Sequence, residues 1–307
     1  MTGAGGFVGQ RLCGALEREI DDLRVIRAGY GDGLSLQMDI TDAGAVEAVI
    51  AREPPDALVH LAAISAVGAA AGHPSQAWAV NYGGTQHILQ ALETHAPACH
   101  LLFISSAEVY GASFASGMAL SEDAPLQPLN DYAASKAAGE GLVREAVGRG
   151  LFATIARPFN HTGPGQSADF VIPSFAAQIA ASERGLREPA VHAGNLDDER
   201  NFMHVDDTVA AYIDIVRRAK ALANGLVLNI AADKSYRIGD LLDRLRAMSA
   251  VPIRVEIDLA RVRTGGIKTV AGDSSRAHTL LGWRPTISMD RTLEEVLNYQ
   301  RDLLRNS

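Results

Sequence analysis

Three glycines stand at equal spacing near the start of the chain, Gly3, Gly6 and Gly9, directly before a helical pattern. Glycine lets a backbone turn tightly and approach another group closely. The first N–H groups of the following helix, with the positive end of its dipole, attract phosphate. The G-x-x-G-x-x-G spacing therefore predicts a loop that holds the pyrophosphate of a dinucleotide. A plain turn between a strand and a helix remains the alternative for this loop taken alone.

Short apolar runs alternate with helical patterns along the chain. The runs are rich in β-branched and aromatic residues, which predicts buried strands, and their alternation with helices predicts a parallel sheet covered on both faces. We therefore expect an α/β fold, a Rossmann-type doubly wound parallel sheet with a smaller α/β substrate-binding domain. The expected strands are 23–28, 57–63, 100–106 and 152–157, and the expected helices are 9–20, 43–52, 76–95, 131–149, 171–184, 206–222, 237–249 and 290–305.

The domain boundaries follow a loss of regularity after residue 160. We assign residues 1–159, together with 203–230, to the dinucleotide-binding domain, and residues 160–202 with 231–307 to the substrate-binding domain. A doubly wound sheet normally leads into the glycine loop with a strand, whereas this loop begins at residue 2. Either the true start lies upstream, which we favour, or the sheet lacks part of its central strand and the apolar burial that goes with it.

Composition excludes several classes of protein. The 307 residues carry 28 Lys and Arg against 36 Asp and Glu, a net charge of −8, which argues against general nucleic-acid binding. No apolar run reaches the ~18 residues that span a membrane, and the N-terminus lacks the basic and apolar regions of a signal peptide. Two distant cysteines, Cys13 and Cys99, exclude a disulfide framework and favour the reducing cytoplasm. His161 and His204 have no second ligand at metal-binding spacing, so we expect no metal.

The end of the expected strand 23–28 bears on the choice of dinucleotide. An NAD site usually carries an acidic residue there for the ribose hydroxyls, and residues 27–30 have none. Arg27 is suited instead to a 2′-phosphate, which favours NADP(H), while the nearby Asp32 keeps NAD(H) possible. Asp39 is a candidate for a hydrogen bond to adenine. The alternative is that Asp39 and Asp42 cap the next helix.

Tyr132 and Lys136 are four residues apart on an expected helix and therefore face the same way. A lysine near a phenol favours the phenolate and lowers its pKa towards working pH. Ser106 ends an expected strand at the carboxyl edge of the sheet, where such folds bind ligands, and its hydroxyl can orient a carbonyl. A Tyr-x-x-x-Lys pair also occurs by chance on helix surfaces. Its position after the glycine loop and a strand ending in Ser-Ser favours a catalytic role.

The segments TGAGGFVG, HLAA, ISSAEVYG, YAASK and RPFNHTGPGQ, in this order, resemble the extended short-chain dehydrogenases/reductases that act on nucleotide sugars. The later segments RPFNHTGPGQSADFVIPSFAAQI and GNLDDERNFMHVDD are most similar to the branch with GDP-mannose 4,6-dehydratases and GDP-4-keto-6-deoxy-mannose reductases. The resemblance covers essentially the whole chain. It implies an NAD(P)H-dependent reduction of the C4 ketone of a GDP-linked 4-keto-6-deoxy sugar, giving GDP-D-rhamnose. A 4,6-dehydratase or a 4-epimerase with a recycled cofactor remains an alternative, as does a silent dinucleotide sensor, which the intact Ser106, Tyr132 and Lys136 speak against.

The resemblance also implies roles for single residues. Tyr132 would be the proton donor, Lys136 its partner, Ser106 the ligand of the C4 oxygen, and Asn81 a support for the site. Among the residues expected to hold the diphosphate, Arg200 has the alternative of a solvated loop charge, and Arg263 lacks the proline that usually follows it. The implied substrate-binding residues are Ser106, Asn160, Arg200 and Arg263, and the implied cofactor-binding residues are Gly3, Gly6, Phe7, Val8, Arg27, Asp39, Ile40, Leu61, Ala62, Ala63, Tyr132, Lys136 and Pro158.

Glu108 completes the implied catalytic set but leaves the reaction open. Dehydratases of this superfamily use a glutamate here to remove the C5 proton, usually beside Asp, Ser or Thr, whereas Ala107 precedes it in this chain. Related reductases can also have Glu, which would then bond sugar hydroxyls or the local backbone. The family commonly pairs the helices 76–95 and 131–149 between subunits, so we expect a homodimer. The alternative is that these helices simply cover the sheet.

Overall fold

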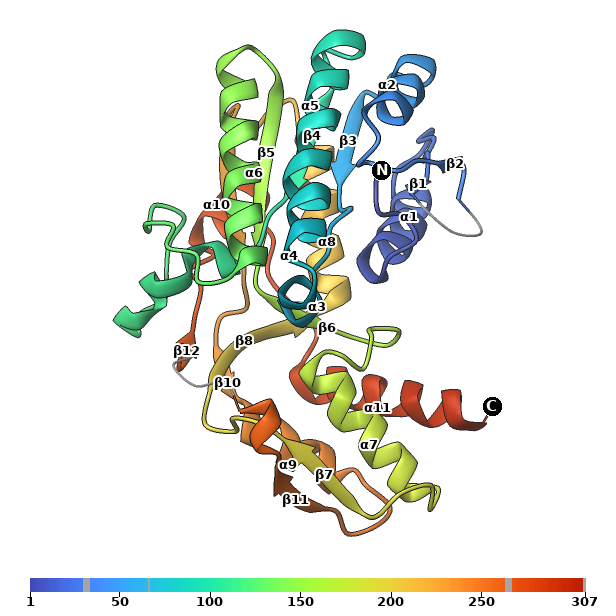
Figure 1. The fold of residues 1–307 in the computed structure, drawn as a ribbon, viewed down its shortest axis with the longest axis vertical. Coiled ribbons are helices and arrows are strands. Elements are labelled where there is room, and N and C mark those ends of the chain that lie inside the picture. Colours follow the sequence, from blue (N-terminus) through green and yellow to red (C-terminus); the bar gives the residue numbers. More distant parts are fainter. Residues whose placement is uncertain (30–33, 66, 263–266, 306–307) are drawn as a thin grey trace.

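A twisted parallel sheet forms the centre of the larger of two lobes in the computed structural model, which describes residues 1–29, 34–65, 67–262 and 267–305 (Figure 1). Strands β3 (Ala57–His60), β4 (His100–Ile104), β5 (Phe152–Pro158) and β9 (Leu226–Ile230) pair in the order β3-β4-β5-β9, all parallel. Their carboxyl ends point towards the smaller lobe. The expected doubly wound sheet is confirmed.

The expected strand 23–28 is largely absent. Only β1 (Ala28–Gly29) forms, paired with the short β2 (Leu36–Gln37), and Thr2 bridges β1 to β3 by pairing with both Ala28 and His60. The N-terminal ammonium group donates to the carbonyl of Ile26 (2.8 Å) and the N–H of Ala28 to the carbonyl of Met1 (2.9 Å). A strand needs a partner along its length. Within the part of the chain that the structure describes, the pairing of this segment is confined to its end, where Met1 and Thr2 lie on one side and Ser35 and Leu36 on the other.

Helices cover both faces of the sheet. α1 (Phe7–Glu19) and α8 (Val205–Arg217) contact each other in one core with α10 (Ser275–Leu281), while α2 (Ala43–Arg52), α5 (Gly84–His95) and α6 (Asp131–Gly148) line the other. Leu102 of β4 points into the first core and Leu101 and Phe103 into the second, as the period of two requires. Such a strand is apolar throughout, which is why its sequence shows a continuous run.

The expected helix 76–95 is three elements in the structure. α4 (Pro74–Trp78) continues through a π-helical segment, η1 (Ala79–Gly83), into α5, and the short α3 (Val67–Gly72) precedes it. π-helical turns inside α-helices often occur at functional sites. After β4, a 3₁₀ segment, η2 (Ala107–Ser116), leads away from the sheet edge.

The smaller lobe packs α7 (Val171–Glu183), α9 (Ile238–Ala247) and α11 (Met289–Arg305) around a separate apolar core, with β7 (Ala190–Ala193) parallel to β11 (Arg254–Ile257) and η3 (Leu259–Arg261) following. A third sheet lies between the lobes. In it β8 (Glu199–His204) pairs with β6 (Asn160–Thr162), β10 (Ser235–Arg237) and β12 (Thr269–Val270). α10, which the domain assignment gives to the substrate side, contacts β9 and α8 of the larger lobe.

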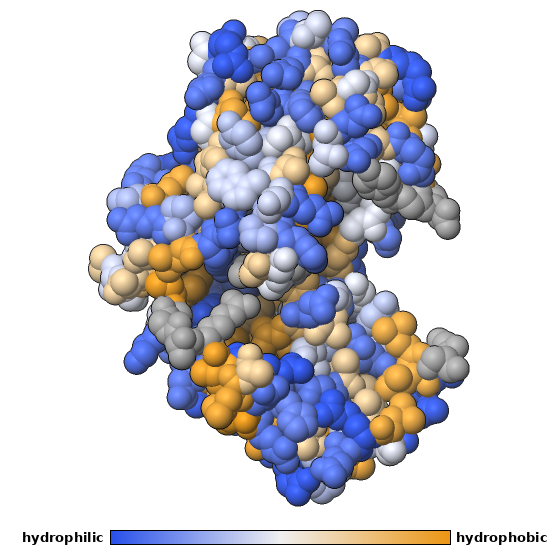
Figure 2. Space-filling model, in the orientation of Figure 1, coloured by the Kyte–Doolittle hydropathy of each residue, from blue (hydrophilic) through white to orange (hydrophobic). Residues whose placement is uncertain are grey.

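The surface is indented between the two lobes, with apolar residues in the recess (Figure 2). Within the described ranges, no group of three or more His, Cys, Asp or Glu side chains is arranged to hold a metal ion. No helix among those residues is long and apolar enough to cross a membrane.

Candidate active site

Ser106 lies directly after β4, at the carboxyl edge of the sheet, and is 8% exposed. It is the N-cap of η2, and its hydroxyl oxygen accepts the backbone N–H of Glu108 (3.1 Å). Because that oxygen already accepts a hydrogen bond, the hydroxyl proton remains available for donation. The local fold thus fixes the position of the Ser106 oxygen and leaves its proton free to donate.

Tyr132 and Lys136 lie in the first two turns of α6, whose N-cap Asn130 accepts the N–H of Ala133 (2.9 Å). Both side chains are buried, at 8% and 3% exposure. The Lys136 ammonium group lies 4.8 Å from the centre of the Phe103 ring. The start of α6 therefore holds both groups under the end of β4.

The electrostatics differ from the sequence-based expectation. Burial raises the pKa of Tyr132 to about 12, with a hydrogen bond from Ser106 lowering it and the charge of Glu108 raising it. Burial also lowers the pKa of Lys136 to about 8, which the carboxylate of Glu140 opposes. The expected lowering of the Tyr132 pKa is therefore wrong, because desolvation of the phenolate outweighs any cationic stabilisation. Tyr132 is therefore protonated at neutral pH. Ser106 and Glu108 are close enough to Tyr132 to influence its pKa.

The glycine loop has the shape that a pyrophosphate requires. Gly3 has a φ of +67°, and a Cβ atom there would lie 2.7 Å from the backbone nitrogen of Ala62. Gly6 is the N-cap of α1 and supplies no side-chain cap, so the first-turn N–H groups at Phe7 and Val8 have no such partner. Unpaired amides at a helix N-terminus are a ready anion site. These residues fit the phosphates of a dinucleotide.

Thr2, His60 and Asn81 hold the loop that follows β3, and only Asn81 among them was expected from the sequence to support the site. The hydroxyl of Thr2 bonds Nδ1 of His60 (2.7 Å) and accepts the N–H of Ala62 (3.3 Å). Asn81, in the π-helical segment, accepts the N–H of Ile64 (2.9 Å) and donates to Ser135 of α6 (3.0 Å). Leu61, Ala62 and Ala63 are thereby fixed beside the glycine loop, and Asn81 ties them to the helix of Tyr132 and Lys136.

The residues expected at the adenosine end are already paired. One Nη2 atom of Arg27 donates to both carboxylate oxygens of Glu17 (2.9 and 2.8 Å). Asp39 accepts the N–H and hydroxyl of Thr41 (2.8 and 2.6 Å), whereas Asp42 caps α2 by accepting the N–H of Ala45. Asp42 therefore fulfils the capping expectation, and Asp39 stabilises the turn before it. Ile40 is buried next to this turn, and Asp32 lies outside the described residues.

The expected substrate residues lie at the junction of the lobes. Pro158 ends β5 and Asn160 begins β6, which pairs with β8 through Phe202. Arg200 is on β8, with its guanidinium donating to Asp198 (2.9 Å) and to the carbonyl of Lys268 (3.1 Å). Arg200 is therefore a structured, ion-paired residue and not a solvated loop charge. The expected Arg263 lies outside the described residues.

Comparisons with known proteins agree with this geometry. The family model described as GDP-mannose 4,6 dehydratase matches residues 1–296. The GDP-6-deoxy-D-mannose reductase of Pseudomonas aeruginosa is 32% identical over 299 residues, covering 97% of this chain and 95% of the relative. The GDP-6-deoxy-D-talose 4-dehydrogenase of Aggregatibacter actinomycetemcomitans is 30% identical over 312 residues, covering 100% and 98%.

Solved structures of other proteins are similar to this chain as well. The structure of RMD from Pseudomonas aeruginosa complexed with NADPH superposes with a TM-score of 0.85 at 30% identity, over 98% of this chain and 97% of that one. A UDP-glucose 4-epimerase from Stenotrophomonas maltophila with bound NAD shares the fold, with a TM-score of 0.86 at 24% identity over 100% of this chain and 98% of that one. The chain therefore belongs to the GDP-mannose 4,6-dehydratase family of the extended short-chain dehydrogenases/reductases.

Proposed function

We propose that this protein reduces the C4 ketone of a GDP-linked 4-keto-6-deoxy sugar, with GDP-4-keto-6-deoxy-D-mannose as substrate and GDP-D-rhamnose as product. The observation that carries the proposal is the buried Tyr132, which burial keeps protonated at neutral pH and whose pKa Ser106 influences, since a reduction needs a proton donor at the new hydroxyl. The names of the two relatives, a deoxymannose reductase and a deoxytalose dehydrogenase, support a GDP-sugar with chemistry at C4.

NADP(H) is the favoured cofactor and NAD(H) a possible one, since one solved relative is complexed with NADPH and another contains NAD. The amides of Phe7 and Val8 would hold its pyrophosphate, while Ala62 and Pro158 would line its path along the sheet edge. When bound, the reduced nicotinamide supplies the hydride. Arg27 would have to exchange its bonds to Glu17 to meet a 2′-phosphate.

The residues of this chain perform the proton chemistry. Ser106 donates its hydroxyl proton in a hydrogen bond to the C4 oxygen, while its own oxygen accepts the amide of Glu108. Tyr132 gives its proton to the same oxygen, so that the C=O bond becomes a C–OH bond. The charge of Lys136 stabilises the tyrosinate that is left. Donors aimed at developing oxyanion charge are usually the largest single contribution to catalysis.

Asn160 and Arg200 would hold the diphosphate, with Arg263 as a further candidate. A guanidinium group suits phosphate oxygens because it can donate two parallel hydrogen bonds. Arg200 would then share or exchange its bond to Asp198 on binding. This substrate end would fix the sugar over the reacting groups.

A 4,6-dehydratase is the second candidate. The charge of Glu108 acts on Tyr132, so a carboxylate stands near the reacting groups, and the matched family model carries a dehydratase description. Ala107 favours the reductase, because the dehydratases usually have a polar side chain beside this glutamate.

We also propose that the enzyme works in the cytoplasm as a homodimer, paired through α5 and α6. Gly83, which ends η1 just before α5, and Gly141 on α6 leave room for a second helix, since a Cβ atom at either would meet nothing within 4 Å. Sedimentation at equilibrium tests the dimer, and a monomer at micromolar concentration would rule it out.

The test of function is NADPH oxidation with enzymatically generated GDP-4-keto-6-deoxy-mannose. One NADPH should be consumed for each ketone reduced. The competing reactions consume none, so a protein that ignores this ketone but eliminates water from GDP-mannose would be a dehydratase. Binding of NADPH without turnover of either substrate would indicate a sensor.

A further inference from the structure

Glu140 lies one helical turn after Lys136 in α6 and is fully buried, with 0% of its surface exposed. Its carboxylate forms two hydrogen bonds with Arg157, from Nε to Oε1 (2.8 Å) and from Nη2 to Oε2 (2.7 Å). The hydroxyl of Ser105 donates a third, to Oε1 (2.6 Å). A buried carboxylate in low dielectric strongly resists losing such partners.

The two buried partners of this carboxylate, Ser105 and Arg157, are each adjacent to a residue of the candidate site. Ser105 directly precedes Ser106 at the end of β4, and Arg157 directly precedes Pro158 at the end of β5. The charge of Glu140 also raises the pKa of Lys136, one turn earlier in α6. One carboxylate therefore ties together α6, β4 and β5, the three elements that carry the reacting groups.

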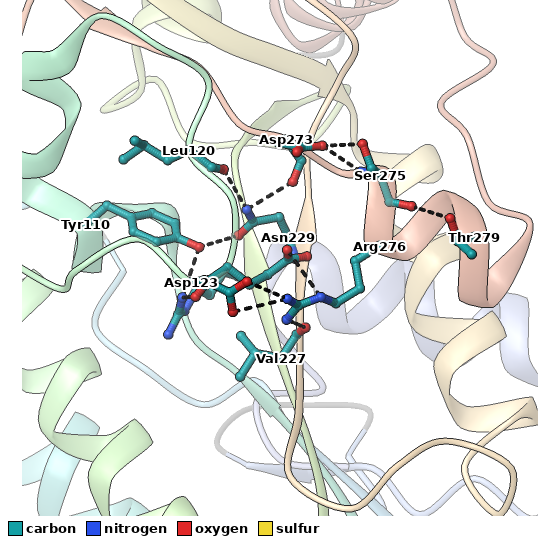
Figure 3. Close-up of polar contacts among 11 residues, drawn as sticks. Tyr110, Leu120, Asp123, Val227, Asn229, Asp273, Ser275, Arg276 and Thr279 are labelled. Carbon is teal, nitrogen blue, oxygen red and sulfur yellow. Dashed lines mark hydrogen bonds and ion pairs between the residues drawn. The ribbon is translucent and has the colours of Figure 1, made fainter.

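Arg157 is itself held from the other side. Its Nη1 atom donates to the hydroxyl of Tyr110 (2.9 Å) and to the carbonyl of Glu122 (3.0 Å), and Tyr110 donates in turn to Asn229 of β9 (2.7 Å). Figure 3 shows Tyr110 directed at Asn229 in this cluster, with Arg276 bonded to Asp123 at its outer end. Arg157 is 1% exposed and cannot turn away without breaking several bonds. The anchor for Glu140 is therefore rigid.

We propose that Glu140 is a positioning residue that sets the geometry of Ser106 and holds Lys136 in its charged form. The role rests on the proposed ketone reduction and touches neither substrate nor cofactor. Without the carboxylate, Ser105 would lose its acceptor and the end of β4 one of its fixed points. Two buried cations, Lys136 and Arg157, would also lose the anion between them.

The environment of Lys136 makes a pH profile informative. The charge of Glu140 raises the pKa of Lys136 against the effect of burial, and the pKa of His60 is lowered by burial first and by the charge of Lys136 second. Loss of the Glu140 charge should lower the pKa of Lys136 further, so that Lys136 loses its proton at a lower pH. The elements packed against α6 carry further titratable or charged groups, namely His87, Glu93 and His95 on α5, Tyr82 on η1, Glu108 and Tyr110 on η2 and Arg157 on β5. α6 itself also carries Asp131, Tyr132, Arg144 and Glu145, and His60 lies on β3.

The test compares Glu140→Gln with wild type in the ketone-reduction assay, using a protein whose fold is checked by circular dichroism. We expect kcat to fall roughly 10- to 100-fold, the size that a small misplacement of reacting groups produces, with KM for the sugar nearly unchanged. The alkaline limb of the kcat profile should move to lower pH by about one unit. Ser105→Ala keeps the ion pair, and should lower kcat without moving that limb.

Two control variants each remove a charge from an ion pair at a residue to which no positioning role is assigned. Arg144 contacts the same carboxylate from the exposed side (3.4 Å), so Arg144→Ala should leave kcat and its pH profile unchanged. Glu183 pairs with Arg301 (2.7 Å) in the smaller lobe, so Glu183→Gln removes a comparable carboxylate from a partly buried ion pair. It should lower the melting temperature and leave the pH profile in place.

The experiment distinguishes a failure of the positioning role of Glu140 from a failure of the proposed ketone reduction. If wild type does not reduce the ketone, the proposed function fails first. If wild type is active and a folded Glu140→Gln protein keeps its kcat and alkaline limb, the positioning role is wrong. If Glu140→Gln does not fold, Ser105→Ala decides, and an unchanged kcat in that variant overturns the proposal.

Discussion

Replacing Lys136 by methionine should make the protein more stable and inactive. Burial lowers the pKa of Lys136 from 10.5 to about 8, a difference of 10.5 − 8 = 2.5 units. At about 1.4 kcal/mol per unit, the folded state holds the ammonium charge at neutral pH at a cost of about 3 kcal/mol. Methionine has a similar length and no charge, so the free energy of unfolding at pH 7 should rise by up to about 3 kcal/mol.

The pH dependence has a definite sign. Between the folded pKa of about 8 and the unfolded value of 10.5, the unfolded Lys136 still binds a proton that the folded one has lost. Wild-type stability therefore gains from this group as pH rises through that window. The advantage of Lys136→Met should be complete below about pH 8 and should vanish towards pH 10.5. Activity should change in the opposite direction, because the reaction needs the charged lysine.

Urea unfolding of wild type and Lys136→Met at pH 7 and at pH 9.5, without ligands, measures this difference. Lys220→Met is the control, because Lys220 is exposed and its loss should alter neither value. The reasoning is refuted if Lys136→Met is less stable than wild type at pH 7. It is equally refuted if the stability difference is the same at both pH values.

Four further predictions concern the reaction and its ligands. Tyr132→Phe should lower kcat by about 10²–10⁴ with the fold retained, as for a lost general acid, and near-normal turnover would mean that the acid lies elsewhere. Arg200→Ala should weaken GDP binding roughly 10- to 150-fold, the loss of a charge-assisted bond, with NADPH binding intact; calorimetry that finds unchanged GDP affinity would reject the role. Glu108→Gln should cost a reductase only about 0.5–1.5 kcal/mol in transition-state stabilisation, whereas a collapse of water elimination from GDP-mannose would identify a dehydratase. Because residues 27–30 of the sequence include no acid, kcat/KM should be higher with NADPH than with NADH, and equal values would count against Arg27 as the ligand of a 2′-phosphate.

Local patterns in the sequence predicted the long helices, although the helix expected at 76–95 is divided by a π-helical segment and the short α3 and α10 were not predicted. The expected helix 43–52 has the observed bounds of α2, and 131–149 exceeds α6 by one residue, because each begins at a residue whose side chain caps its first turn. Ser106 and Tyr132 come together because parallel strands end at one edge, which strand order and helix alternation already imply.

Tertiary structure alone decided the properties that depend on burial and on distant partners. The segment 23–28 reads as a strand, yet only Ala28–Gly29 pairs, since pairing depends on what lies alongside. The strands of the smaller lobe are short and were not expected, because their partners are remote in sequence.

Protonation states and ion pairs likewise depend on burial and on partners that are distant in the sequence. The motif around Tyr132 suggests a lowered phenol pKa, but its sign is set by desolvation inside a core that residues far along the chain complete. The sequence gives no sign that Arg27 pairs with Glu17, which the fold brings next to it. It also does not mark Glu140, whose partners Ser105 and Arg157 come from the ends of two strands. A sequence determines which groups are available, whereas their protonation and orientation depend on the solvent that folding removes and on the partners that folding brings.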